Sequence, residues 1–367
     1  GISIESGSDT SISASSIAAV TDKEKADINV KAGGDIIVAS GKDTSTYNES
    51  SSSKGLFSKK SSSQQRYDED TAASQLIASG NINLKADGNA VISGSGVSAE
   101  ENVSIEGDSV ALLGAQEQHA SASSSKKSGL FAGSGGGFFS LWGKNEKEKS
   151  QATELNSGTR VMGGTDVTLK ARDTDVNIIG SSIMTGRDLT LEAARDVNVT
   201  PGAESSASLE KQRRSGFGFS FSSGDGSVSI GLGYGKSLDQ TQQSSETNAK
   251  SVLFAGRDVS VSADRDANLQ AAKATAAGSV AIDAKNNVNL LSAIDTTNYE
   301  HIHQELFAGI SLNLQSKLLG VGQSLVAAGE SMGGENGAYS IAPAALAAYR
   351  AYKALNNGGA APSISLT

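Results

Sequence analysis

The sequence predicts an all-β fold in which short strands stack into a parallel β-helix. A ladder of alternating hydrophobic residues recurs at 81–86, 166–171 and 258–263, and within each copy it returns after 21 or 22 residues, as from Ile82 to Val103. A fixed period of about twenty residues in strand-like sequence is typical of a β-solenoid. Aromatic residues make up only 5% of the chain and prolines number 3, which suits a narrow aliphatic core interrupted by many turns.

The overall composition narrows the class of protein. The 367 residues carry a formal net charge of −9, which argues against nucleic acid as a partner. Cysteine is absent, so the fold does not depend on disulfides. No apolar run is long enough to predict a transmembrane helix. Because Ile2 and Ile4 already alternate and no signal peptide is visible, we expect the chain to be a piece of a longer protein.

The predicted coil is clearest at 186–199. Its pattern is Gly-x-Asp-Φ-x-Φ-x-Ala-x-x-Asp-Φ-x-Φ, where Φ is Val, Ile or Leu. Alternation places Leu189 and Leu191 on one face of a strand and the polar residues on the other, while the Gly-x-Asp segments supply tight turns. The coils that follow this template, with a weaker one first, occupy 1–21, 22–41, 75–95, 96–115, 159–179, 180–202, 251–271 and 272–294.

Long polar excursions with a Gly-aromatic centre interrupt every second coil. Within a solenoid predicted over 1–295, they occupy 42–74, 116–158 and 203–250. A fourth excursion and a transition take 296–330. We expect 331–367 to be a helical cap or a linker to a missing downstream domain, because 343–357 has the pattern of a short amphipathic helix.

The third excursion predicts a β-hairpin. Phenylalanines alternate with Gly and Ser over 217–221, a Ser-Gly-Asp-Gly turn follows, and Val, Ile, Leu and Tyr alternate with small residues over 228–234. The hairpin is therefore expected to have one apolar face and one face of small residues.

The apolar centres of the four excursions are the candidate contacts with a membrane or a protein partner. They are Leu56, Phe57, Leu130, Phe131, Phe138, Phe139, Trp142, Phe217, Phe219, Phe221, Ile230, Leu232, Tyr234 and Phe307. The flanking basic candidates are Lys54, Lys59, Lys127, Lys144, Arg213, Arg214 and Lys236. An apolar tip with a basic collar is typical of hairpins that bind or enter a membrane. Two other states stay open from the sequence, namely tips folded back against the solenoid and disorder.

No residue pattern predicts catalysis, a cofactor or a metal site. The pair His301-x-His303 has ligand spacing for a strand, but no carboxylate or cysteine cluster accompanies it. Aspartates at 173, 175, 264 and 266 recur at corresponding turns, so we interpret them as turn-forming side chains and not as acid/base pairs. We expect a protein that is not an enzyme.

The coil motif, the paired-coil unit and the Lys-Gly-Leu-Phe and Ser-Gly-Leu-Phe centres at 54–57 and 128–131 resemble the haemagglutinin repeats of two-partner-secretion exoproteins. This family comprises the filamentous haemagglutinins and the CdiA-type effectors of contact-dependent growth inhibition. The resemblance covers about residues 20–315.

The resemblance implies a secreted protein at the Gram-negative cell surface, or at the outer membrane of a target cell. Its expected partners are an outer-membrane two-partner-secretion transporter during export, the target-cell outer membrane or a surface receptor, and a C-terminal domain of the same polypeptide. The expected function is to aid delivery of a C-terminal toxin across the target-cell outer membrane. The alternative that the resemblance leaves open is an adhesin stalk of the filamentous-haemagglutinin type, which binds host or neighbouring cells.

Overall fold

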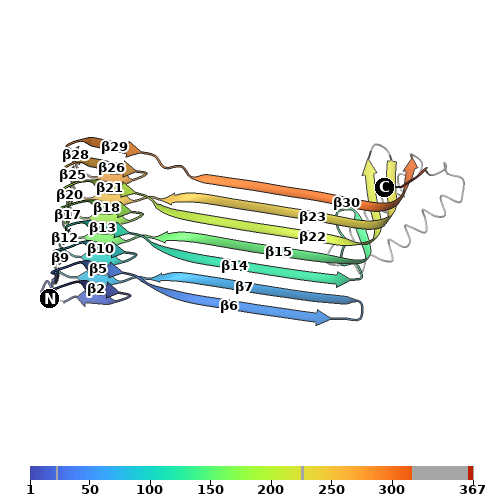
Figure 1. The fold of residues 1–367 in the computed structure, drawn as a ribbon, viewed down its shortest axis with the longest axis horizontal. Helices are drawn as coiled ribbons and strands as arrows, with labels where there is room; N and C mark the ends of the chain where they lie inside the picture. Colours follow the sequence, from blue (N-terminus) through green and yellow to red (C-terminus); the bar gives the residue numbers. More distant parts are fainter. Residues whose placement is uncertain (22–23, 225–226, 316–362, 367) are drawn as a thin grey trace.

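The described chain is built from β-strands, which form three parallel sheets and one antiparallel sheet (Figure 1). The structure, a computed structural model, describes residues 1–21, 24–224, 227–315 and 363–366. Within these residues there is no helix that could cross a bilayer. The all-β class is confirmed, and the stacked parallel sheets are those expected of a β-solenoid. The helix expected at 343–357 lies outside the described residues.

Three parallel sheets form the solenoid, and we call them sheets I, II and III. Sheet I contains, in order of pairing, β1 (Ile2–Ser6), β4 (Ile28–Ala32), β9 (Ile82–Ala86), β12 (Val103–Gly107), β17 (Val167–Ala171), β20 (Leu189–Ala193), β25 (Val259–Ala263) and β28 (Val280–Ala284). Sheet II contains β2 (Thr10–Ser13), β5 (Ile36–Ala39), β10 (Ala90–Ser93), β13 (Val110–Leu113), β18 (Val176–Ile179), β21 (Val197–Thr200), β26 (Asp266–Gln270) and β29 (Asn287–Leu291). Sheet III contains β3 (Ser16–Ala19), β8 (Gln75–Ala78), β11 (Gly96–Ala99), β16 (Arg160–Gly163), β19 (Ser182–Thr185), β24 (Val252–Ala255) and β27 (Lys273–Ala276).

One coil of the solenoid contributes one strand to each sheet, as β1, β2 and β3 do in the first coil. The next coil begins with β4, which pairs in parallel with β1 and places Ile28 opposite Ile2. The same register continues along the solenoid, so Val103 lies opposite Ile82 on one side and Val167 on the other. Equivalent residues of successive coils therefore stack directly on one another, whether or not a hairpin lies between them in the sequence.

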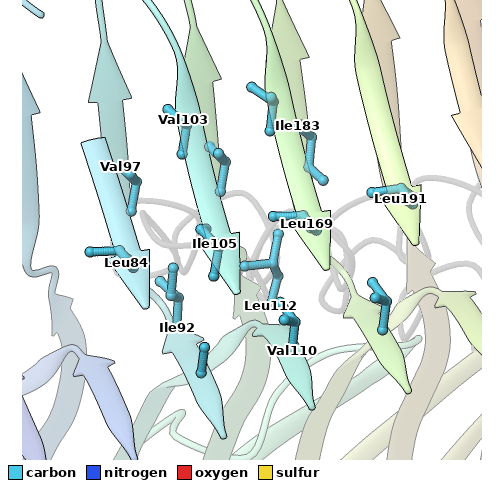
Figure 2. Packing of buried hydrophobic residues seen from close by; sticks show 14 of the residues in the cluster. Leu84, Ile92, Val97, Val103, Ile105, Val110, Leu112, Leu169, Ile183 and Leu191 are labelled. Carbon is cyan, nitrogen blue, oxygen red and sulfur yellow. The ribbon is translucent and has the colours of Figure 1, made fainter. Parts of the chain in front are cut away.

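The inward-facing residues of the three sheets fill the solenoid (Figure 2). On β12, Val103 and Ile105 are buried and the residue between them is partly exposed. Ile105 lies between Leu84 and Leu169 of the neighbouring coils and has no exposed surface. The core is made of Ile, Leu, Val and Ala, which explains why a chain of this length needs so few aromatic residues.

The long excursions are β-hairpins that join into a single antiparallel sheet, which we call the hairpin sheet. Its strands are, in order of pairing, β6 (Gly41–Lys54), β7 (Ser58–Ala72), β14 (Ala115–Gly129), β15 (Phe138–Ser157), β22 (Gly202–Gly224), β23 (Ser227–Ala249), β30 (Thr296–Gln315) and β31 (Ser363–Leu366). Each hairpin lies between the sheet II strand and the sheet III strand of its coil, as β6 and β7 lie between β5 and β8. Strand β30 follows β29 at the same place in the last described coil.

Pairing between successive hairpins is the feature that the sequence did not predict. Strand β7 of the first hairpin pairs with β14 of the second, and β15 of the second pairs with β22 of the third. Stacked coils and paired strands share a spacing of about 4.8 Å. A two-stranded hairpin that leaves every second coil is therefore as wide as the two coils beneath it, so the hairpins meet edge to edge.

The hairpins run away from the solenoid and not back along it (Figure 1). The buried cluster of the solenoid contains no residue of β6, β7, β14, β15, β22 or β23. Among the described residues, the arrangement with hairpin aromatics packed on the solenoid is thus absent. The aromatic centres lie instead toward the free end of the hairpin sheet.

Candidate functional site

A row of glycines crosses the hairpin sheet near its free end, and we call it the glycine row. Gly129, Gly143, Gly216 and Gly235 lie opposite one another on β14, β15, β22 and β23. A Cβ on Gly216 would come within 2.9 Å of the Cα of Gly143, so this close approach requires glycine. Beyond the row β22 and β23 continue, and Figure 1 shows the free ends of β22, β23 and β30 bent away from the longer part of the sheet.

Beyond the glycine row, one face of the sheet carries a patch of large apolar side chains, which we call the apolar tip face. Its members are Trp142 on β15, Phe217, Phe219 and Phe221 on β22, Ile230, Leu232 and Tyr234 on β23, and Ile310 on β30. Direct opposition across the strands, as of Phe217 with Trp142 and Tyr234, places these side chains on one side. Trp142 is 57% exposed and Phe217 is 49% exposed. The patch therefore faces solvent.

On the opposite face of the same strands, glycines such as Gly231, Gly233 and Gly235 of β23 form a surface without side chains, which we call the glycine floor. Gly231 lies on β23, where a Cβ would come within 2.8 Å of the ring of Phe307, and a Cβ on Gly235 would come within 3.0 Å of the ring of Phe138. These two rings meet edge to face with centroids 6.3 Å apart. Phe138 and Phe307 thus cover the glycine floor and are not part of the apolar tip face.

The remaining apolar candidates are divided between a turn and a buried pair. Leu56 and Phe57 form the turn between β6 and β7 and are 90% and 56% exposed. Phe139 is buried beneath Phe131, with ring centroids 5.1 Å apart. Leu130 is partly exposed beside this pair and its N–H donates to the carbonyl of Phe57. The fourteen candidates therefore do not form one exposed surface; seven of them belong to the apolar tip face, and Phe139, which lies opposite Phe219, is on the same side of the sheet but is buried.

Basic side chains from three hairpins align directly behind the glycine row, on the side of the solenoid. One register line contains Lys54, Lys59, Ser128, Lys144, Ser215, Lys236 and Leu306. Because Ser215 is two residues from Phe217 on β22, the lysines of this line share the face of the apolar tip. Arg213, a further two residues back, also lies on that face. Lys127 and Arg214 lie in the next line, on the opposite face. The predicted basic collar thus surrounds the sheet on both faces.

One carboxylate in this region offsets part of the collar. Glu146 accepts hydrogen bonds from Lys144 at 2.7 Å and Lys126 at 3.1 Å. The contact with Lys144 holds the pKa of the Glu146 carboxyl below its usual range, and the same contact raises the pKa of the Lys144 ammonium. Lys236 lies 5.7 Å from the ring centroid of Tyr234, in reach of a cation–π contact. Lys236 therefore connects the line of lysines with the apolar tip face on β23.

Sequence reasoning missed a cluster near the base of the hairpin sheet. Asp70, Glu117 and His119 each place one ligand-type atom within 4.8 Å of the others. They come from β7 and β14, two strands of different hairpins, so the cluster depends on the pairing that the sequence did not predict. The i, i+2 spacing of Glu117 and His119, with that of Asp68 and Asp70, was the available signal.

Comparison with known proteins agrees with the fold. The chain matches the family model described as hemagglutinin repeat over residues 1–55, 56–141 and 139–306. It is 35% identical over 78 residues to the 16S rRNA endonuclease CdiA of Enterobacter cloacae, 30% identical over 178 residues to the tRNA nuclease CdiA-2 of Burkholderia pseudomallei, and 28% identical over 206 residues to the tRNA nuclease CdiA of Yersinia mollaretii. No solved structure matches the chain.

These matches cover 21%, 46% and 52% of this chain, but only 2%, 5% and 7% of the three relatives. The nuclease names therefore describe proteins of which this chain resembles a small part. The family model, in contrast, matches most of the chain in three consecutive stretches. The chain belongs to the hemagglutinin-repeat family, and it corresponds to a repeat region of CdiA-type two-partner-secretion exoproteins.

Proposed function

We propose that this chain is a non-enzymatic, secreted module that contacts the outer membrane of a target cell through the free end of its hairpin sheet and so aids delivery of a C-terminal toxin. The solenoid is the support, and the apolar tip face is the contact. The observation that carries the proposal is the apolar patch on β15, β22, β23 and β30, with a line of lysines directly behind it on the same face.

The order of the two features suits a membrane surface. Apolar side chains gain free energy by leaving water for the acyl region, while lysines just behind them reach the anionic headgroups. Lys144 and Lys236 flank Ser215 across the strands, two residues behind Phe217. The apolar arms, such as 217–221, are shorter than the roughly 9–11 residues of a spanning strand. The tip therefore enters the headgroup and outer acyl region and does not span the bilayer.

Binding to lipid vesicles tests the proposal. We expect the purified chain to bind vesicles that contain phosphatidylglycerol or lipopolysaccharide, and to bind less as the salt concentration rises because the lysine contacts are screened. The combined substitutions Phe217→Ser, Phe219→Ser and Phe221→Ser should abolish binding, measured by vesicle co-sedimentation. They should also remove the blue shift of Trp142 fluorescence that contact with lipid produces.

A matched control comes from the outer face of the solenoid. Ile77, Met184 and Phe254 on sheet III are 38%, 40% and 43% exposed, which is close to the 49% of Phe217 and more than the partly buried Phe219 and Phe221. Replacing these three by Ser should leave vesicle binding unchanged. Equal loss of binding in both triple variants, or no binding by the unmodified chain, would contradict membrane contact by the tip.

The adhesin alternative makes a different prediction for the complete exoprotein. If the tip delivers the toxin, the triple phenylalanine variant should kill fewer target cells while it attaches to them as before. If the tip instead binds a receptor as part of an adhesin stalk, attachment itself should fall. A cell-attachment assay run beside the killing assay separates the two outcomes.

A further inference from the structure

The cluster of Asp70, Glu117 and His119 has the make-up of a metal site. The imidazole Nε2 of His119 lies 3.9 Å from a carboxylate oxygen of Asp70. Tetrahedral ligands about 2.1 Å from a zinc ion lie roughly 3.4 Å from one another. Asp70 is mostly exposed, so a small side-chain rotation closes this gap without a change in the backbone.

The histidine is already oriented for an ion. Its Nδ1 lies 3.1 Å from a carboxylate oxygen of Asp68, and the other oxygen of Asp68 accepts from Arg66 Nε at 2.6 Å. A carboxylate paired with arginine only accepts hydrogen bonds, so Nδ1 carries the proton of the neutral imidazole, and Nε2, on the side of Asp70, is the nitrogen that can bind an ion. A carboxylate behind a histidine ligand is the usual support of such sites.

Arg66 pairs with Asp68, but the carboxylates of Asp70 and Glu117 add further negative charge beside His119. Asp43 lies directly opposite Asp70 in the pairing of β6 with β7, and like charges in opposed positions destabilise a sheet. Glu117 is held nearby, because its Oε1 accepts from the backbone N–H of Thr71 at 3.1 Å. Its second carboxylate oxygen stays available to a ligand. A divalent ion would compensate the charge of this group.

The position of the cluster gives an ion a structural role. Pairing of β7 with β14 begins at Glu69 and Gln118 and continues to the free end. Asp70 and Glu117 come next toward the solenoid, where the two strands part to enter different coils. An ion held by Asp70 from one side and by Glu117 and His119 from the other would tie the first hairpin to the second at the point where their pairing ends.

We propose that Asp70, Glu117 and His119 bind a divalent first-row transition ion, with Zn²⁺ as the probe, and that the ion clamps the seam between the first two hairpins. Nitrogen and carboxylate ligands suit zinc better than calcium or magnesium, which prefer oxygen alone. The ion has three protein ligands, and water completes its coordination. Asp68 is a positioning residue and not a ligand.

Calorimetric titration of Zn²⁺ into the metal-stripped chain tests the site. We expect the unmodified chain to bind one ion. The substitution His119→Ala or Asp70→Asn should abolish this binding. Asp68→Asn should weaken binding about 10-fold to 100-fold, as for other residues that support a ligand. His303→Ala is the matched control, because His303 also contacts two carboxylates on the hairpin sheet, Asp239 and Glu305, and it should leave binding unchanged.

Hydrogen exchange supplies a second measurement. Zn²⁺ should slow exchange of the β7 and β14 amides near Glu69 and Gln118 in the unmodified chain, and not in Asp70→Asn, whose exposed side chain can be changed without disturbing packing. Failure of Zn²⁺ to bind stoichiometrically would overturn the proposal. So would binding that survives both His119→Ala and Asp70→Asn, or binding that is lost in His303→Ala.

Discussion

Arginine and aspartate side chains link the turns of neighbouring coils. Arg195 donates from Nε to Asp175 at 2.7 Å, one coil earlier, and Asp175 also accepts from the backbone N–H of Asp196 at 3.1 Å. The same pairing joins Arg265 to Asp196. The Arg195-Asp196 dipeptide therefore links three coils. Its arginine donates to Asp175 of the coil before it, and its aspartate accepts hydrogen bonds from Arg265 and from the backbone N–H of Asp266 in the coil after it.

Acidification should weaken this ladder. The arginine contact holds the pKa of the Asp175 carboxyl below its usual range. A lowered native pKa contributes stability above the unfolded value, about 3.9, and that contribution is lost as the pH falls through the native pKa. We expect the urea midpoint of the solenoid to fall below about pH 4, and to fall less in Asp175→Asn. The control Asp283→Asn changes an exposed position of β28 and should keep the full pH dependence. If the urea midpoint fell with pH equally in Asp175→Asn and in the unmodified chain, the role of Asp175 would be contradicted.

At the scale of single elements, the solenoid strands are short and owe their stability to stacking. Strand β12 has only five residues, but each of its inward side chains meets its equivalent on β9 and on β17. Such a strand gains little from its own coil alone, since each coil contacts only its neighbours. A defect in a central coil should therefore be felt on both sides of it.

Ile105→Ala tests this dependence. Ile105 is fully buried between Leu84 and Leu169, so its truncation should lower the free energy of unfolding by about 2–5 kcal/mol. Ile77→Ala, at a 38% exposed position of β8, should cost less than about 1 kcal/mol. Urea unfolding followed by circular dichroism measures both. Equal destabilisation by the two variants would mean that inward stacking does not dominate the stability of the coils.

The sequence was sufficient for some of these elements and not for others. Alternation and a period near twenty residues predict β12 and its partners, because burial inside a coil is a local property of the pattern. Asp173, Asp175 and Asp264 lie between strands, as expected, whereas Asp266 is the first residue of β26. The pairing of β7 with β14 was not predictable from either strand, since both are Ser-rich and show no apolar periodicity. For the same reason the Asp70, Glu117 and His119 cluster was not found, and Phe138 could not be assigned to the glycine floor.

At the scale of the whole molecule, the solenoid determines the hairpin sheet. The coil spacing determines where each hairpin starts, and two coils match the width of one hairpin. The hairpin sheet, in contrast, contributes nothing to the buried cluster of the solenoid. We therefore expect the two parts to respond differently when one hairpin is removed.

Replacing residues 203–248 with a short Gly/Ser turn tests this asymmetry. Gly202 lies opposite Ala249 at the base of the third hairpin, so a tight turn can join β21 to β24 without moving either strand. We expect the urea midpoint of the solenoid to stay unchanged while vesicle binding is lost, because β22 and β23 carry most of the apolar tip face. The matched deletion of 43–70 removes the first hairpin, which contributes Lys54 and Lys59 to the lysine line but no side chain to the apolar patch, and should preserve most of the vesicle binding. A collapse of the solenoid in both deletions would show that the hairpin sheet supports the coils, and would contradict the dependence of the sheet on the solenoid argued here.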